Sequence, residues 1–217
     1  VKQQVLRIKV QKNMEIKCNF DIGSYKTGNH YTCYIDAQKI EPNQSLKLIR
    51  EHKSVKSNDD ITAVRFNKCQ MTRIPRELTE IFPNLTVLFV VNSGLKILQK
   101  EDFKDFKNLR YIYFEGNEIE FLPGNLFDHV KDIEHIWLGN NKTKFIEPNL
   151  LDDLPKLKSI SLSKNVSIDR RFDDRNNGSL GNATLEQADY ITQIALKYQT
   201  MGFKLAPFSA FGKPVFK

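Results

Sequence analysis

Four histidines and three cysteines are the side chains of this 217-residue chain best suited to metal binding or catalysis. The histidines, at positions 30, 52, 129 and 135, match no metal-ligand spacing, and no glycine-rich phosphate loop or serine-nucleophile pattern occurs. Acid pairs such as Asp152–Asp153 and Asp173–Asp174 stand in loop-like segments, where solvation explains them better than acid–base catalysis. We therefore expect no enzyme activity, no metal and no cofactor, although a triad assembled from distant residues would leave no such pattern.

Two of the cysteines stand in neighbouring strand-like runs. Cys18 lies in EIKCNF and Cys33 in YTCYI, and the turn-rich segment DIGSYKTGNH separates them. If the two runs form a hairpin, the thiols come together, and a disulfide would stabilise the fold by about 2–4 kcal/mol. Two unpaired buried thiols are the alternative.

The composition is that of an ordinary globular chain, 40% hydrophobic and 27% charged. A net charge of +7 and a pI near 9.2 raise the question of nucleic acids or other polyanions. The lysines and arginines are scattered, however, so we expect no nucleic-acid partner. No run of about eighteen apolar residues occurs, so we expect no membrane span, and the first residues do not resemble a secretory signal.

The chain contains an internal repeat. Five segments with the same pattern of apolar residues start 24 residues apart, without an insertion. They are ITAVRFNKCQM from position 61, LTVLFVVNSGL from 85, LRYIYFEGNEI from 109, IEHIWLGNNKT from 133 and LKSISLSKNVS from 157.

The shared pattern L-x-x-L-x-L-x-x-N-x-L resembles the leucine-rich repeat. The 24-residue length, with Phe103 and Phe127 on the returning side, resembles the class found in Toll-type receptors and small secreted arthropod proteins. The resemblance covers roughly residues 61–170. It implies an α/β repeat fold, a right-handed solenoid with a parallel β-sheet on its concave face, an N-terminal β-hairpin cap and a C-terminal helical cap.

The resemblance also explains the ninth position of the repeat. In such proteins an asparagine there lies inside the coil and satisfies backbone groups where the chain leaves the strand. Cysteine is an accepted substitute, so we expect Cys69 to be an interior thiol without reactivity. In this chain the position holds Cys69, Ser93, Asn117, Asn141 and Asn165.

We divide the chain into three parts: residues 1–60 as an N-terminal cap, 61–170 as the repeats, and 171–217 as a C-terminal helical cap and tail. Within the first, 34–40 (YIDAQKI) reads as a rung-like strand. In the last, Thr184 begins an apolar stripe at helical spacing, and Gln187 completes a capping box. That helix either covers the last coil or binds a partner.

A disulfide and this repeat class favour secretion, with the signal peptide already removed from this chain. Glycosylation sequons begin at positions 43, 84, 141, 165, 177 and 182. Asn141 and Asn165 fall on interior positions, so we expect them to be unmodified. We predict Asn177 and Asn182 as the acceptors because they lie in a polar segment.

The positions of each strand that point away from the core would line the concave face, and several carry large apolar side chains. A contiguous apolar patch with tyrosine and tryptophan is typical of an interface. We therefore predict a binding surface for a protein partner there, either another protein or a second copy of this chain. A structural or matrix role, or binding of a carbohydrate or polyanion, remains open, and the resemblance alone implies innate immunity or extracellular signalling. The predicted binding residues are Val87, Phe89, Val91, Tyr111, Tyr113, His135 and Trp137, with Arg65 and Glu115 in a polar rim that also includes Lys68, Arg110, Glu134 and Lys158.

Overall fold

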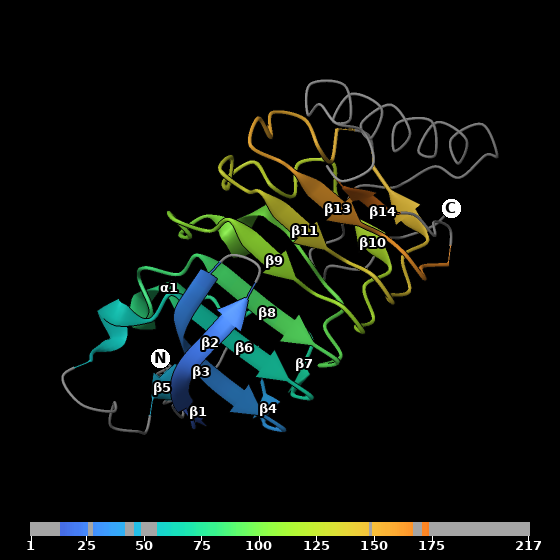
Figure 1. Ribbon diagram of the computed structural model, residues 1–217. Coiled ribbons are helices and arrows are strands. Elements are labelled where there is room, and N and C mark those ends of the chain that lie inside the picture. The colour runs from blue at the N-terminus through green and yellow to red at the C-terminus, as the bar shows by residue number, and fades with distance from the viewer. Residues whose placement is uncertain are drawn as a thin grey trace, which may run out of the picture.

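The protein is described by a computed structural model covering residues 14–25, 28–41, 46–48, 56–147, 149–166 and 171–173. One sheet of eight strands forms its centre (Figure 1). Adjacent strands are parallel from β3 to β13, and an antiparallel strand completes each edge. In spatial order the strands are β14 (Arg171–Asp173), β13 (Ser159–Ser161), β11 (His135–Trp137), β9 (Tyr111–Tyr113), β8 (Val87–Val91), β6 (Ala63–Asn67), β3 (Gly28–Asp36) and β2 (Asn19–Tyr25).

The 24-residue repeat sets the register of this sheet. Val64 pairs with Leu88, Leu88 with Ile112, and Ile112 with Ile136. Because successive strand residues point to opposite faces, this register brings the central apolar residue of every repeat onto the core side. The predicted leucine-rich repeat fold with a parallel sheet is confirmed.

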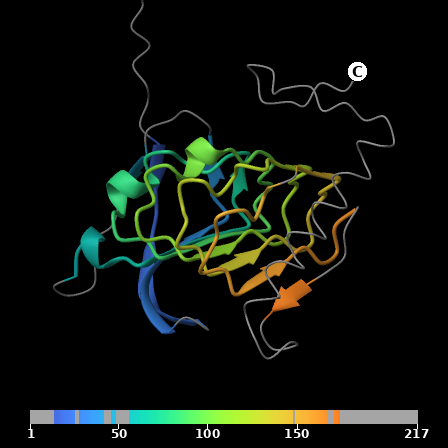
Figure 2. The ribbon, with the colours of Figure 1, turned by 90° about the horizontal axis from the view of Figure 1, so that it is seen from above.

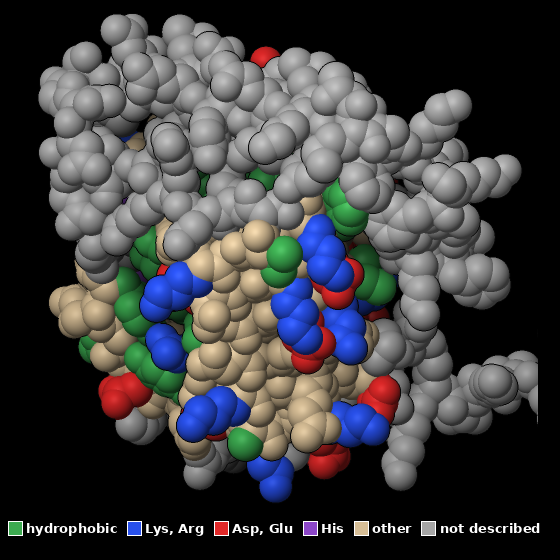
Figure 3. Space-filling model, turned by 90° about the vertical axis from the view of Figure 1, so that its right-hand side faces the viewer, with side chains coloured by type: hydrophobic (Ala, Val, Ile, Leu, Met, Phe, Trp, Pro, Cys, Tyr) green, Lys and Arg blue, Asp and Glu red, His purple; other side chains and the backbone are tan. Residues whose placement is uncertain are grey.

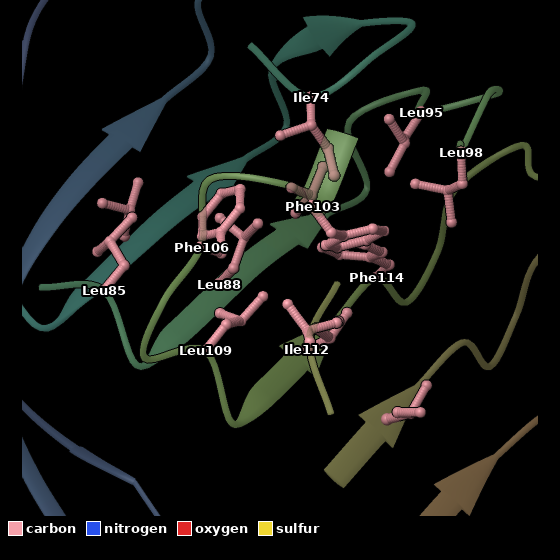
Figure 4. Packing of buried hydrophobic residues seen from close by; sticks show 14 of the residues in the cluster. Ile74, Leu85, Leu88, Leu95, Leu98, Phe103, Phe106, Leu109, Ile112 and Phe114 are labelled. Atoms are coloured by element: carbon pink, nitrogen blue, oxygen red, sulfur yellow. The ribbon is translucent and has the colours of Figure 1, made fainter. Parts of the chain in front are cut away.

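Each coil is filled by side chains from its strand and from its returning segment (Figure 4). Phe103 and Phe114 are almost completely buried, and their ring centroids lie 6.4 Å apart. A fully buried side chain of this size contributes about 1.5–3 kcal/mol of transfer free energy, so stacked coils stabilise one another. Figure 4 labels further members of this core: Ile74, Leu85, Leu88, Leu95, Leu98, Phe106, Leu109 and Ile112.

The returning segments contain little helix in the described part of the chain. A 24-residue repeat leaves few residues for the return, so this side consists of short turns, and the helical share of the expected α/β repeat is small (Figure 2). The elements there and at the N-terminal end are α1 (Leu78–Ile81), the 3-10 helices η1 (Asn58–Asp60) and η2 (Lys100–Phe103), and three parallel pairs: β1 (Met14–Ile16) with β5 (Leu46–Leu48), β4 (Lys39–Ile40) with β7 (Gln70–Met71), and β10 (Phe121–Leu122) with β12 (Phe145–Ile146). No helix among the described residues is long and apolar enough to cross a membrane.

The ninth-position side chains lie inside the coils, as expected. Asn117 Oδ1 accepts hydrogen bonds from the backbone N–H groups of Ser93 (3.0 Å) and Leu95 (3.2 Å). Its Nδ2 donates to the carbonyl oxygens of Val90 (2.6 Å) and Phe114 (3.0 Å). One side chain thus joins two coils, because the groups it bonds belong to its own repeat and to the preceding one.

Cys69 occupies the same place in the first repeat. Its side chain is buried and its Sγ donates to the carbonyl oxygen of Ile35, 3.3 Å away. Burial raises the pKa of this thiol, so it stays protonated at neutral pH. The interior location predicted for Cys69 is confirmed.

The N-terminal region forms the predicted hairpin of β2 and β3, and a disulfide joins Cys18 to Cys33. The strand expected at 34–40 is placed differently. The chain turns at Ala37, which has a φ of 50°, so β3 ends at Asp36 and pairs with β6, whereas β4 pairs with β7 on another side. This strand of the cap is therefore a rung of the central sheet.

The predicted helix from Thr184, and the predicted glycan acceptors Asn177 and Asn182, lie outside the described residues. The division of the chain at residues 60 and 170 stays a prediction.

Replacing Asn117 by alanine should strongly destabilise the fold. The substitution leaves two buried N–H groups and two carbonyl groups without their partner, and each such buried group costs about 1–3 kcal/mol. We expect the free energy of unfolding to fall by about 3 kcal/mol or more, measured by urea denaturation with the fluorescence of the single tryptophan. Asn125→Ala, at an exposed position, is the matched control, and an equal loss in both variants would refute the role of the ladder.

The cysteine pairing predicts a specific alkylation pattern. Under denaturing conditions without reductant only Cys69 should be modified, and all three cysteines should react after reduction. A Cys18→Ser/Cys33→Ser variant should lose about 2–4 kcal/mol of unfolding free energy. Three modified cysteines in the unreduced protein would contradict the disulfide.

Candidate functional site

The outer face of the central sheet, which points away from the core, brings the predicted binding residues together. Parallel pairing aligns Val87 with Tyr111 and His135 in one column. It aligns Phe89 with Tyr113 and Trp137 in the next column, which we call the aromatic ladder. Three adjacent strands, β8, β9 and β11, therefore carry this group of side chains.

The rings of the aromatic ladder stack on one another along the sheet. The ring centroids of Phe89 and Tyr113 lie 4.4 Å apart at an interplanar angle of 17°, and those of Tyr113 and Trp137 lie 4.4 Å apart at 8°. Beside them, Tyr111 and His135 are stacked at 5.1 Å. Neighbouring strands are about 4.8 Å apart, so the register of the sheet is itself a spacing at which flat rings stack.

Three of the predicted patch residues are more buried than we expected from the sequence. Val87 is 0% exposed, Phe89 5% and Trp137 9%, whereas Tyr111, Tyr113 and His135 are half-buried. Stacking hides the faces of the rings, so the accessible apolar surface is narrower than a row of upright side chains would give. Val91, at the end of β8, is also half-buried.

Tyr25, a residue that the sequence analysis missed, covers one end of the ladder. It belongs to the hairpin, and its ring centroid lies 4.7 Å from that of Phe89 (Figure 1). Its hydroxyl lies 3.1 Å from that of Tyr34, and burial raises the pKa of Tyr25 to about 12. On the same side of the ladder the guanidinium of Arg65 lies 5.4 Å from the Phe89 ring centroid, which is cation–π range.

Gly23 is the sequence signal that could have indicated this arrangement. A Cβ at this position would lie 2.6 Å from the Tyr34 hydroxyl and would also meet the Tyr25 hydroxyl. A glycine within a strand often marks a site of close approach, and here two tyrosine side chains fill the space above it.

A buried carboxylate organises the edge at which the strands begin. Glu134 accepts hydrogen bonds from Lys158 Nζ (2.6 Å) and Arg110 Nη1 (3.2 Å), and a third from the Tyr111 hydroxyl (3.2 Å). Burial opposes its ionisation, but the bond and charge of Lys158 outweigh burial and lower the pKa of Glu134. Two cations share one carboxylate here, so this cluster has a net positive charge.

The neighbouring side chains of the outer face are neutral or lie at its margin. Burial raises the pKa of Tyr113 to about 12, so its phenol stays protonated. His135 Nδ1 lies 2.6 Å from Ser159 Oγ. Glu115, predicted as part of the rim, is exposed at the edge where the strands end.

A shallow concavity of about 350 Å³ lies beside the cationic cluster. It is lined by polar side chains at the beginning of the strands, together with one face of Tyr111. Its lining residues are His30, Asn84, Thr86, Asn108, Arg110 and Tyr111. Within the described residues, no group of three or more histidine, cysteine or acidic side chains is placed to hold a metal ion.

Comparison with solved structures shows the same fold. The LRIM1/APL1C complex shares 20% identity at a TM-score of 0.54, over 71% of this chain and 27% of that one. The APL1 leucine-rich repeat domain shares 20% at a TM-score of 0.53, over 70% of this chain and 36% of that one. The Toll–Spatzle complex of Drosophila shares 25% identity at a TM-score of 0.46, over 56% and 17%.

This chain therefore spans about a quarter to a third of the length of the first two of these proteins. A search of curated proteins found no match. The family model described as "Leucine rich repeat" matches residues 83–141 and 115–166, which include β8, β9, β11 and β13. With the register of its strands and the ladder of interior side chains, the chain is a leucine-rich repeat protein.

Proposed function

We propose that this chain is a secreted leucine-rich repeat module that binds a protein partner through its predicted concave face. The observation that supports this most directly is the accessible edge of Tyr111, Tyr113 and His135 next to the cationic cluster of Arg110, Glu134 and Lys158. The partner that fits is a folded protein presenting an apolar side chain beside an acidic one.

Stacking prepares the aromatic side chains for binding. A ring held between two neighbours has little rotamer freedom left to lose, so less entropy opposes association. Tyrosine and tryptophan also combine a large contact area with a polar group, which is why they are frequent in binding hot spots. Tyr113, between Phe89 and Trp137, has these properties.

The charge beside the ladder indicates the kind of partner. Glu134 neutralises only one of the two cations that it contacts, and the side chain of Arg110 is 49% exposed. An acidic group on the partner would complete this cluster, and charges at the margin of an interface mainly speed association.

Secretion is part of the proposal, and the disulfide between Cys18 and Cys33 supports it, since such bonds persist in oxidising compartments. One of the solved proteins of the same fold is itself a complex, LRIM1/APL1C, which supports assembly with another protein. The family resemblance places the proposed role in innate immunity or extracellular signalling.

Binding of a polyanion is the second candidate because the chain carries a net charge of +7. The surface shown in Figure 3 argues against it, since lysine and arginine lie beside acidic side chains there rather than in one continuous patch. Ion pairs between successive repeats have this character, such as Lys142 with Glu118 and Lys144 with Glu120.

A Tyr111→Ala/Tyr113→Ala variant should lose partner binding. The partner is first identified by cross-linking and mass spectrometry in extracellular fluid of the source organism, and its affinity is then measured by biolayer interferometry. We expect at least a tenfold increase in Kd, because hot-spot tyrosines contribute about 2 kcal/mol or more. Lys144→Ala, an exposed position on another side of the coil, is the matched control.

If the tyrosine variant and the control bind equally well, the proposed face is wrong. Light scattering that shows a dimer of the unmutated chain, abolished in the variant, would identify a second copy as the occupant. Retention on heparin that both variants share would favour the polyanion instead.

Removing the cationic pair should slow association. In an Arg110→Ala/Lys158→Ala variant the association rate constant should fall several-fold at low salt, and the difference should shrink as ionic strength rises. Lys156→Ala/Lys131→Ala removes the same charge from ion pairs with loop carboxylates and is the control. An unchanged association rate would show that the partner is not acidic at this edge.

A further inference from the structure

Three glycosylation sequons have their asparagine within the described residues: Asn84-Leu-Thr, Asn141-Lys-Thr and Asn165-Val-Ser. We propose that Asn84 is a further acceptor of an N-linked oligosaccharide, and that it alone of these three carries a glycan in the folded protein. The proposal rests on the proposed secretion, because this modification is made in the secretory pathway.

The number of amide hydrogens distinguishes the three sites. An asparagine side-chain nitrogen carries two N–H groups, and a glycan replaces one of them. Asn141 is 6% exposed, and its Nδ2 donates to the carbonyl oxygens of Phe114 (2.8 Å) and Leu138 (3.0 Å). A sugar on this nitrogen would remove one of these bonds and would have to lie inside the coil.

Asn165 is held in the same way. Its Nδ2 donates to the carbonyl oxygens of Leu138 and Leu162, both at 2.9 Å, and its Oδ1 accepts from the backbone N–H of Thr143 at 3.1 Å. Both hydrogens of this nitrogen are used within the coil. A glycan is incompatible with the folded rung at Asn165 as well as at Asn141.

Asn84 differs from both in exposure and in hydrogen bonding. It is exposed in the turn that precedes β8, and its Nδ2 donates to the carbonyl oxygen of Asp59 at 2.9 Å. A glycosylated amide keeps one N–H, so this bond can persist after modification. The turn therefore accommodates a sugar without losing a contact that the structure shows.

The reaction requires a donor oligosaccharide linked to a lipid pyrophosphate. The Asn84 amide nitrogen forms a bond to the anomeric carbon of the first sugar, and the bond from that carbon to the pyrophosphate oxygen breaks. The lipid pyrophosphate leaves with the electron pair, and the nitrogen loses one proton to the catalytic base of the transferase. Thr86 supplies the hydroxyl residue that the sequon requires at its third position.

The location of Asn84 connects this glycan to the candidate binding face. Asn84 lines the same concavity as Arg110 and Tyr111, at the edge where the strands begin. A glycan there stands beside the cationic cluster and limits how far a partner can extend over this edge.

The test uses the chain secreted from insect cells behind a supplied signal peptide, so that its result does not depend on the natural export route. The folded monomer is treated with peptide N-glycosidase F in heavy-oxygen water, which converts each glycosylated asparagine into labelled aspartate, and peptides are analysed by mass spectrometry. We expect label at Asn84 and none at Asn141 or Asn165. Asn84→Gln and Thr86→Val should abolish the label, and Thr86→Ser should retain it.

Asn108→Gln is the matched control. Asn108 stands 24 residues after Asn84, lines the same concavity and is followed by Leu-Arg, so it has no sequon. This variant should keep the label at Asn84. An unlabelled Asn84 in the folded, secreted protein overturns the proposal, whether or not Asn177 and Asn182 are labelled, and so does label at Asn141 or Asn165. Neither result bears on the proposed partner face, which the tyrosine variant tests separately.

Discussion

Each coil of this protein has to turn off its strand inside the molecule, and the peptide groups of that turn have to be satisfied without water. An unpaired buried peptide group costs about 1–3 kcal/mol, so a stack of such turns could not be stable without partners. The ninth-position side chains provide these partners, and asparagine does so best because its amide both donates and accepts. Asn117, for example, bonds groups of two successive repeats, which makes the turn of one coil part of its neighbour.

The turn has a backbone requirement as well. The residue before the ninth position has a positive φ in each repeat: Lys68, Asn92, Gly116, Asn140 and Lys164. Ala37 has the same conformation at the end of β3, although 31 residues, rather than 24, separate it from Lys68. The hairpin region thus ends its rung with the same turn as the repeats do. The disulfide between Cys18 and Cys33 ties the hairpin to this rung.

The fixed spacing of the strands also governs the candidate binding face. Rings at equivalent positions of adjacent repeats are brought to stacking distance, and the stack is continued by Tyr25 from the hairpin. This order has two consequences for function. The tyrosines are held in place before a partner arrives, which favours binding, but most of their faces are already occupied, so a partner meets ring edges and hydroxyl groups.

The sequence by itself determined the periodic part of the protein. A 24-residue repeat predicted the parallel sheet, its register, the columns of Tyr113 and Trp137, and the interior place of Cys69, because one rung follows from the next by translation. Strand-like runs around Cys18 and Cys33 also sufficed to predict the hairpin and its disulfide. Only the tertiary structure decided what depends on contacts between non-equivalent segments. The strand of the N-terminal rung escaped the repeat because its spacing differs, and the packing of Tyr25 on Phe89 joins residues that no periodicity relates. The exposure of the aromatic ladder and of the Asn84 turn was likewise undetermined, since burial depends on what packs against a residue rather than on its own position in a pattern.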